Sequence, residues 1–366
     1  MGGNAPLFSK LSDALASFTG GSGSAIGLSI GSSSIKLVEL QKVKKTWKLQ
    51  HFAMVPLPDD ALSNREIINH ISVVESIKAL IDPSKMKLKS KQVCSAMAGT
   101  SLIIKRMMVE VPKISELQDS IFWEAEQYLP FDAQEVVMDF QVLSRGKDNK
   151  TDVILVAVKK SVLDTYMNCI LDAGLKPKIM DTEFFALQNV FEANYPMDPS
   201  KAVAIVDIGA TSIKIVVVHG GVPVYTKDTS LGGRNLTAEI EKHLNLSFVD
   251  AESLKVSGHA TGMPQEVSDL MGVMADNFAV EIRRALDFYN ASSSGAPVEF
   301  ILLGGGSSKI PELSRLVEDK VGLPTQILNP FNAISYDPAV FSPEYIAEIG
   351  PLAAVPIGLA LRAGAR

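Results

Sequence analysis

The sequence predicts an α/β protein of two or more domains, because three features of the chain agree. Its 366 residues exceed the size at which one hydrophobic core usually stops growing. From residue 25 onward, apolar strand-like runs alternate with segments of helical periodicity. One strand–glycine turn–strand unit occurs twice, about half a chain apart, which indicates a duplicated half.

The first half begins with strands expected at 26–30, 35–40 and 47–55, and the first two are separated by a glycine–serine turn. A helix is expected from Asn64 to Ile81, where apolar residues recur at helical spacing. Residues 91–175 then read as a compact unit with strands at 93–98, 102–111, 136–143 and 153–158. Its helices are expected at 115–129, with Ser115 as the N-cap, and at 161–173.

The second half repeats the opening pattern with strands expected at 202–207 and 213–218 around another glycine turn. A helical region extends from Leu231 to about Tyr289, and a strand follows at 299–303. A glycine cluster then precedes a helix from Pro311 to Val321, which Gly322 is expected to end. A mainly apolar segment near 352–361 is typical of a core helix.

The composition is that of a folded soluble protein, with 46% apolar and 21% charged residues. A net charge of −6 argues against a general nucleic-acid binder, because phosphate backbones favour basic surfaces. The two cysteines, Cys94 and Cys169, form no Cys-x-x-Cys motif and suit a reducing cytoplasm. The five histidines show no ligand spacing, so we expect no His/Cys metal site.

No run of 18 apolar residues occurs, so we expect no transmembrane segment. The nearest candidate, Pro351 to Leu361, is too short and contains Pro356. Near the N-terminus, a glycine–serine linker at 20–24 follows an apolar stripe. The stripe either docks on its own protein or contacts a membrane or partner. It consists of Leu7, Leu11, Leu15 and Phe18.

The duplicated unit aligns residues 30–38 with residues 208–216 at a constant offset of 178. Glycine in such a turn lets backbone N–H groups approach an anion closely, and neighbouring hydroxyls add donors. A single turn of this kind is usually only a hairpin, but two matched copies favour a clamp that holds a polyphosphate from both sides. Gly304 to Gly306, directly after a buried strand, is a weaker third element. It lacks the dinucleotide-binding glycine spacing, and the chain has no Walker motif.

This order of elements resembles the actin/Hsp70/sugar-kinase superfamily, and within it the PilM family of actin-like type IV pilus proteins. The likeness extends over residues 26–364, and its most specific stretches are 30–40 and 123–131. It implies an actin-like ATPase fold of two lobes on duplicated mixed sheets with an inserted FtsA-type subdomain. The implied divisions are an N-terminal extension and linker (1–24), a first-lobe core (25–90, 176–200 and 331–366), the inserted subdomain (91–175), a second-lobe core (201–231 and 297–330) and a second-lobe helical subdomain (232–296).

The resemblance also implies ATP and Mg²⁺ as ligands, with Asp207 holding Mg²⁺ through water and Glu183 orienting the attacking water. It assigns Glu252 and Lys255, one helical turn apart, to the ribose hydroxyls, although their spacing alone favours a surface ion pair. The implied nucleotide-binding residues are Gly31, Ser32, Ser33, Ser34, Lys36, Asp207, Gly209, Ala210, Thr211, Ser212, Gly232, Gly233, Glu252, Lys255, Gly304, Gly305, Gly306 and Ser307.

One departure from the superfamily pattern bears on turnover. The position that pairs with Asp207 in the repeat, commonly Asp, is Ser29 here. Phosphoryl transfer relies on carboxylates to organise Mg²⁺, whereas backbone donors suffice to hold phosphate. We therefore expect ATP binding with slow or no hydrolysis.

The resemblance implies a cytoplasmic ATP-binding scaffold of the type IV pilus machinery, peripheral at the inner membrane through its partners. The implied partner is the N-terminal tail of a PilN-like inner-membrane protein, together with other pilus platform proteins and self-association. One alternative is an FtsA-like membrane-associated filament former, although the chain ends without an amphipathic helix. The other is a kinase of the sugar-kinase branch, for which the sequence offers no convincing sugar pocket.

Overall fold

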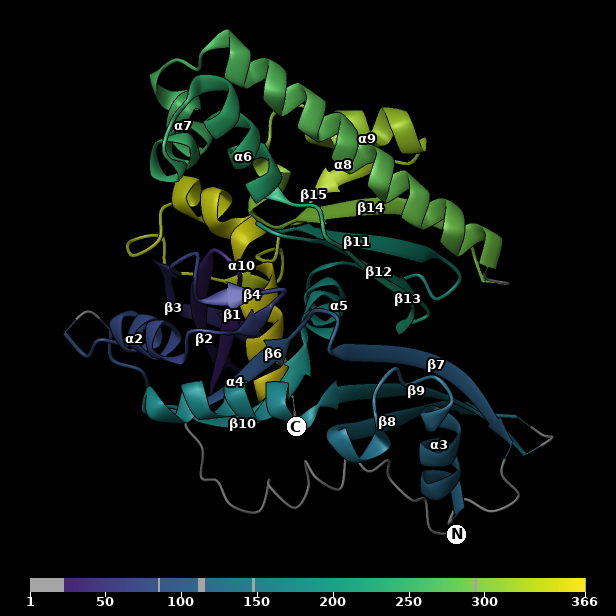
Figure 1. Ribbon diagram of the computed structural model, residues 1–366. Helices are drawn as coiled ribbons and strands as arrows, with labels where there is room; N and C mark the ends of the chain where they lie inside the picture. The colour runs from purple at the N-terminus through teal and green to yellow at the C-terminus, as the bar shows by residue number, and fades with distance from the viewer. Residues whose placement is uncertain (1–22, 85, 111–115, 147–148, 293–294, 366) are drawn as a thin grey trace.

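The computed structural model describes residues 23–84, 86–110, 116–146, 149–292 and 295–365. The N-terminal stripe of Leu7, Leu11, Leu15 and Phe18 and the proposed N-cap Ser115 lie outside these residues. Two large mixed sheets and their helices form the body of the molecule, and a smaller sheet lies to one side (Figure 1).

The first large sheet has six strands in the order β10-β6-β1-β2-β3-β16. Strand β1 lies antiparallel to β2 and parallel to β6. It therefore belongs both to the antiparallel meander β1-β2-β3 and to a parallel pair with β6. The strands of this sheet are β1 (Ser24–Ile30), β2 (Ser34–Val43), β3 (Thr46–Pro56), β6 (Gln92–Met97), β10 (Lys176–Thr182) and β16 (Ile334–Ser335).

The second large sheet has five strands in the order β13-β12-β11-β14-β15. Here β11 lies antiparallel to β12 and parallel to β14, as β1 does to β2 and β6. The duplication predicted from the glycine turns therefore extends to whole sheets. The strands are β11 (Ala202–Ile208), β12 (Ile213–His219), β13 (Val222–Thr229), β14 (Val298–Gly304) and β15 (Thr325–Ile327).

Helices cover both sheets and also separate them. Helices α2 (His70–Leu80) and α4 (Lys160–Asp172) pack on the outer face of the six-stranded sheet. Helices α5 (Glu183–Asn194) and α10 (Pro343–Gly364) contribute to one hydrophobic core that also contains residues of both sheets. The outer face of the five-stranded sheet is covered by further helices, which lie at the top of Figure 1. These include α6 (Gly233–Leu244), α8 (Gln265–Ser292) and α9 (Leu313–Val321), and α7 (Phe248–Thr261) lies beside α6.

The separate sheet has three antiparallel strands in the order β7-β9-β8 and a hydrophobic core of its own with α3. Its elements are β7 (Leu102–Glu110), α3 (Leu117–Glu126), the 3₁₀ turn η2 (Ala133–Glu135), β8 (Val136–Arg145) and β9 (Lys150–Lys159). This sheet and its helix cover fewer residues than the range 91–175 expected for the subdomain. At the start of that range β6 pairs with β1, and near its end α4 packs beside α2, because the apolar faces of β6 and α4 complete the first lobe.

The helix expected from Asn64 to Ile81 begins only at His70. Residues before it form a short hairpin of β4 (Leu62–Ser63) and β5 (Glu66–Ile67). The two residues between these strands have positive φ, which a helix does not allow. Asn69 then caps α2, because its side chain accepts a hydrogen bond from Ser72 N at 3.1 Å. The expectation of a helix over 64–69 was therefore wrong.

The closing helix α10 is longer than expected and has Pro351 and Pro356 inside it. Among the described residues, α10 is the one helix that is long and apolar enough to cross a membrane, yet 67% of that window is buried inside the protein. Gly358 lies against α5 so closely that a Cβ there would be 1.9 Å from Ala186 O. On the other side of α10, a Cβ on Gly27 would lie 2.0 Å from Pro356 O. Two glycines thus allow α10 to approach its neighbours backbone to backbone.

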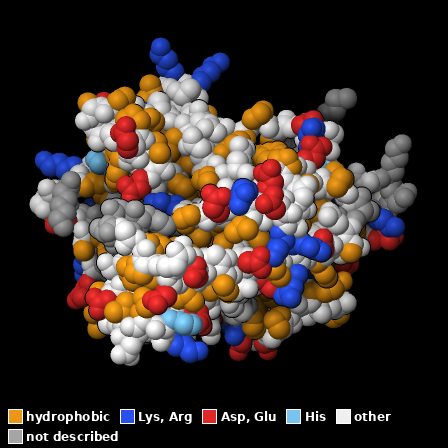
Figure 2. All heavy atoms as spheres, turned by 90° about the horizontal axis from the view of Figure 1, so that it is seen from above, with side chains coloured by type: hydrophobic (Ala, Val, Ile, Leu, Met, Phe, Trp, Pro, Cys, Tyr) orange, Lys and Arg blue, Asp and Glu red, His pale blue; other side chains and the backbone are white. Residues whose placement is uncertain are grey.

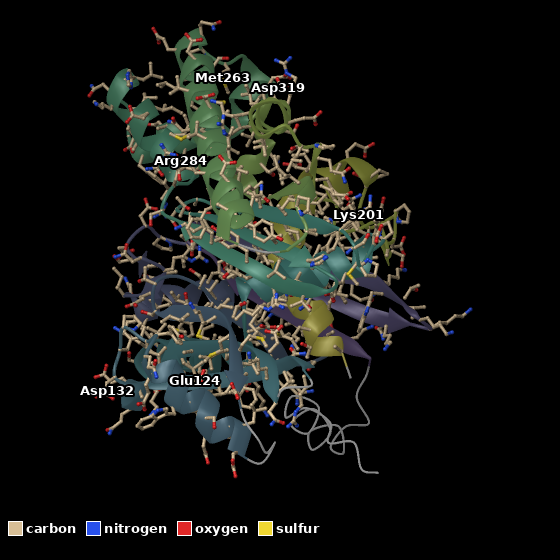
Figure 3. The ribbon with its side chains drawn as sticks, turned by 90° about the vertical axis from the view of Figure 1, so that its right-hand side faces the viewer. Glu124, Asp132, Lys201, Met263, Arg284 and Asp319 are labelled. Atoms are coloured by element: carbon tan, nitrogen blue, oxygen red, sulfur yellow. The ribbon has the colours of Figure 1, made fainter. Side chains whose placement is uncertain are left out.

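The long axis of the molecule runs from the helices of the second lobe to the three-stranded sheet. Met263 and Asp319 lie toward one end, and Glu124 and Asp132 toward the other (Figure 3). On the face seen from above, acidic and basic side chains are interspersed among hydrophobic ones (Figure 2). The even mixture on this face accords with the modest net charge of −6.

Candidate functional site

The two glycine turns meet where the lobes face each other. Ser32 Oγ of the first turn lies 2.8 Å from Thr211 Oγ1 of the second. Each turn is closed in the same way, since Gly31 N donates to Ser34 O at 3.1 Å and Gly209 N donates to Ser212 O at 2.9 Å. The structure therefore brings together the two hairpins that the sequence predicts to act as a pair.

The lysine of each hairpin lies directly across from the position where the two copies differ. In the first hairpin Lys36 is opposite Ser29, and in the second Lys214 is opposite Asp207. Lys214 Nζ contacts Asp207 Oδ2 at 3.1 Å. Within the described residues, Lys36 has no carboxylate oxygen within 4 Å. One hairpin thus carries a neutralised lysine and the other a lysine that is free for an anion.

A buried ionic cluster joins the second hairpin to the start of α5. Glu183 Oε2, 4% exposed as a residue, lies 2.5 Å from Arg65 Nη2 and 3.1 Å from Lys214 Nζ. Thr182 caps the helix and holds Glu183 in its first turn, where a negative charge suits the helix dipole. Glu183, predicted to orient water, is therefore held by two cations, and its catalytic role stays a prediction.

Burial and neighbouring charges act in opposite directions on these groups. Burial lowers the pKa of Lys36, although Asp207 and Glu183 partly offset it. Burial would raise the pKa of Glu183, but Arg65 and Lys214 outweigh it and hold the pKa below the usual value. Burial and Arg65 would lower the pKa of Lys214, but the two carboxylates raise it. Glu183 and Lys214 are thus both held in their charged forms.

The start of α6 and the glycine cluster after β14 close around the second turn. Gly233 N and Ser307 Oγ both donate to Gly209 O, at 2.9 and 3.2 Å. A Cβ on Gly233 would lie 2.5 Å from Ser307 Oγ, and one on Gly305 would lie 2.4 Å from Ile208 O. Gly305 also has a φ of +82°, which favours glycine. Side chains at these glycines would fill the space beside the turn.

The proposed ribose pair exists as an ion pair next to α6. Lys255 Nζ lies 2.6 Å from Glu252 Oε2, and both groups hydrogen-bond Thr237 Oγ1. Lys255 Nζ also donates to Gly233 O at 3.2 Å. The pair thus lies at the glycine entry to α6 rather than on an open surface, and its contact with ribose stays a prediction.

The donor set fits a magnesium-bound polyphosphate. Backbone N–H groups at glycine turns, hydroxyls and Lys36 are phosphate ligands, and Asp207 offers the hard oxygen that Mg²⁺ prefers. Glycine also leaves space beside the lysine of each hairpin. A Cβ on Gly31 would lie 3.9 Å from Lys36 Nζ, and one on Gly209 would lie 3.8 Å from Lys214 Nζ. A Cβ on Gly304 would lie 3.8 Å from Asp207 Oδ1.

Two arginines of the site were missed from the sequence. Arg65 lay inside the helix expected from Asn64, and nothing in its neighbourhood marks a site residue. Arg234 joins the lobes, since its Nη2 donates to Ser32 O at 2.8 Å and to Asp59 Oδ1 at 2.5 Å. The one available signal for Arg234 was its position directly after Gly232 and Gly233.

Two duplicated sheets with facing glycine turns define an actin-like α/β protein. Residues 27–364 match the family described as type IV pilus assembly protein PilM. The chain belongs to this PilM family, which agrees with the resemblance drawn from its motifs. A chain of the solved PilM–PilN type IV pilus biogenesis complex is 28% identical, with a TM-score of 0.81 over 93% of this chain and 99% of that one.

More distant proteins share the fold. Cell division protein FtsA of Bacillus subtilis strain 168 is 24% identical over 259 residues, which are 64% of this chain and 58% of FtsA. The chain thus spans 58% of the length of this curated relative. The structure of MreB5 of Spiroplasma citri bound to AMPPNP matches at 12% identity and a TM-score of 0.50, over 92% of this chain and 94% of that one.

Proposed function

We propose that this type IV pilus assembly protein binds ATP with Mg²⁺ between its two glycine hairpins and turns it over slowly or not at all. The lobes, held together by the nucleotide, present a surface to the N-terminal cytoplasmic tail of a PilN-like inner-membrane protein. The protein is then a cytoplasmic scaffold at the inner membrane, attached through that partner and other pilus platform proteins.

The observation that carries this proposal is the difference between two otherwise matching hairpins. Both have the same turn and the same lysine, but Lys214 faces Asp207 while Lys36 faces Ser29. Holding phosphate needs the donors that both copies keep, whereas transfer needs carboxylates that organise Mg²⁺ and water. Glu183, the other carboxylate of the site, is bound to Arg65 and Lys214. Binding without rapid hydrolysis follows from this donor set.

Nucleotide binding is tested by calorimetric titration of the purified protein with ATP and Mg²⁺, followed by a phosphate-release assay. We expect saturable binding and a release rate no faster than about 10⁻³ per second, the range of an unassisted nucleotide hydrolase. A double variant, Lys36→Met with Ser32→Ala, should bind ATP weakly. Rapid, saturable release by the unmodified protein would refute the scaffold proposal.

The partner is tested by pull-down with an immobilised peptide of the N-terminal tail of a PilN-like protein from the same genome. The family membership and the likeness to a PilM–PilN complex support this choice. A scrambled peptide of the same composition is the control. Retention on the tail peptide in the presence of ATP and Mg²⁺ is the expected result, and equal retention on both peptides would contradict it.

A further inference from the structure

The short hairpin β4–β5 carries a buried arginine into the region where the glycine turns meet. Asn64 and Arg65, the residues between its strands, have φ values of +47° and +67°. Two such residues in succession form the tight turn typical of two-residue hairpins, but arginine is uncommon there. Gly99 packs against this turn, and a Cβ on it would lie 3.0 Å from Asn64 O. The backbone is thus held in an unfavourable conformation by its neighbours.

The guanidinium group of Arg65 is buried and incompletely bonded. Its Nη2 contacts Glu183 Oε2 at 2.5 Å, and its Nη1 donates to Ser212 Oγ at a long 3.4 Å. In the part of the chain that the structure describes, its Nε is buried and has no hydrogen-bond partner. The side chain is only 9% exposed. Buried donors are nearly always satisfied, so this group is set to receive an additional acceptor.

The position of Arg65 along the second turn indicates which acceptor it would meet. Gly233 and Ser307, two of the proposed nucleotide-binding residues, bond the turn at Gly209, and Gly233 O also accepts from Lys255 of the proposed ribose pair. Arg65 contacts the same turn at Ser212 and also contacts Glu183, the residue expected to orient the water that attacks the terminal phosphate. A nucleotide with its ribose at Glu252 and Lys255 and its terminal phosphate near Glu183 would therefore bring that phosphate to Arg65. A guanidinium binds phosphate oxygens with two parallel hydrogen bonds, and Glu183 would keep Lys214 as its partner meanwhile.

The same hairpin is bonded both to α4, through its main chain, and to the start of the three-stranded sheet, through the Glu66 side chain. Arg65 O accepts a hydrogen bond from Tyr166 Oη of α4 at 2.8 Å, in the interior. The adjacent Glu66 accepts from Ser101 Oγ, just before β7, and Ser101 O accepts from Lys159 N, the last residue of β9, at 3.2 Å. One small hairpin thus connects the phosphate region to both points where the chain enters and leaves that sheet.

We propose that Arg65 is a sensor of the terminal phosphate, which distinguishes a nucleoside triphosphate from a diphosphate and couples that difference to the three-stranded sheet. This inference rests on the proposed binding of ATP between the hairpins. Arg65 acts as a binding and positioning residue, since it moves no proton and breaks no bond in this role.

The first test compares ATP and ADP affinities, each with Mg²⁺, in full-length Arg65→Gln and Arg65→Lys. For Arg65→Gln we expect ATP binding to weaken about tenfold or more, the loss of roughly one charged hydrogen-bonded pair, while ADP binding changes by less than about twofold. Arg65→Lys keeps the charge but not the paired geometry and should give an intermediate loss. The exposed Arg315→Gln serves as the matched control and should change neither affinity.

The second test measures hydrogen exchange in β7 and β9 with ATP and with ADP. We expect slower exchange with ATP in the unmodified protein and no such difference in Arg65→Gln. Ser101→Ala should keep the preference for ATP and lose the difference in exchange, because it removes only the hydrogen bond between Ser101 and Glu66 that joins the hairpin to the start of β7.

The outcomes separate this inference from the function on which it rests. Failure of the unmodified protein to bind ATP would overturn the proposed function itself. Normal ATP binding with equal weakening for ATP and ADP in Arg65→Gln, or with no weakening, would overturn the role of Arg65. If Arg65→Gln does not fold, the test uses folded Arg65→Lys. An unchanged ratio of ATP to ADP affinity in that variant would also overturn the role of Arg65.

Discussion

Gly358 offers a sharp test of how α10 is seated, because the substitution Gly358→Ala adds one methyl group where backbone already lies. The new Cβ would be 1.9 Å from Ala186 O and 2.5 Å from Ala186 C, whereas ordinary contacts begin at 3.4 Å. Helix α10 would have to move by about 1.5 Å from α5, and no side-chain rotation can relieve the contact. Such overpacking costs about 3 kcal/mol, against about 1 kcal/mol that alanine gains over glycine in a helix. We expect a net loss of about 2 kcal/mol.

Gly272 in α8 supplies the control, because it is exposed and a Cβ there meets nothing within 4 Å. Gly272→Ala should gain up to about 1 kcal/mol from helix propensity alone, which makes the difference between the two variants about 3 kcal/mol. Urea unfolding followed by far-ultraviolet circular dichroism measures both values. If Gly358→Ala were as stable as Gly272→Ala, the close approach of α10 to α5 would be wrong.

Three further predictions concern the site. Ser29→Asp should place a carboxylate opposite Lys36, as Asp207 lies opposite Lys214, and should raise the rate of phosphate release about tenfold or more. Ser29→Asn, which is of similar size but uncharged, should leave that rate unchanged. Equal release rates for the two variants would contradict the reasoning. Glu183→Gln should cost about 3 kcal/mol at pH 7, because it breaks a buried ion pair. The pKa of Glu183 in the folded protein lies below its ordinary value of 4.5, so the charged form stabilises the fold above that pH. The cost of Glu183→Gln should therefore shrink as the pH falls through the folded pKa. If the variant lost the same free energy of unfolding, relative to the unmodified protein, at neutral and at acid pH, this reasoning would be refuted. Glu252→Gln should weaken ATP binding roughly tenfold, whereas Glu312→Gln, in an exposed pair of the same i,i+3 spacing, should leave the calorimetric affinity unchanged.

The duplicated fold was predictable because it repeats a local pattern. Residues 30–38 and 208–216 carry the same turn and the same lysine, and strand pairing places both lysines opposite equivalent positions. Turn chemistry and the alternation of apolar runs are short-range properties, so one sequence contains them. The proximity of Ser32 and Thr211 followed from the repeat together with the family resemblance.

Arg65 could not be predicted because its placement depends on distant neighbours. Its segment has apolar residues at helical spacing as far as Ile81, so periodicity favoured a helix from Asn64. The conformation is decided by Gly99, Tyr166 and Glu183, which are contributed by three other parts of the chain. The limits of the small sheet were missed for a similar reason, since β6 reads as any short strand and only its pairing with β1 assigns it to the first lobe.

The shared core around α5 and α10 has a consequence for how the molecule loses its structure. Residues of both large sheets, such as Val38 and Val203, belong to the same buried cluster as these two helices. Each large sheet has a separate core with its outer helices, but the inner faces of both sheets depend on this shared cluster, so the two lobes should melt in a single cooperative transition. The three-stranded sheet keeps its own core with Ile121 and Val153 and can open as a separate unit while the rest stays folded.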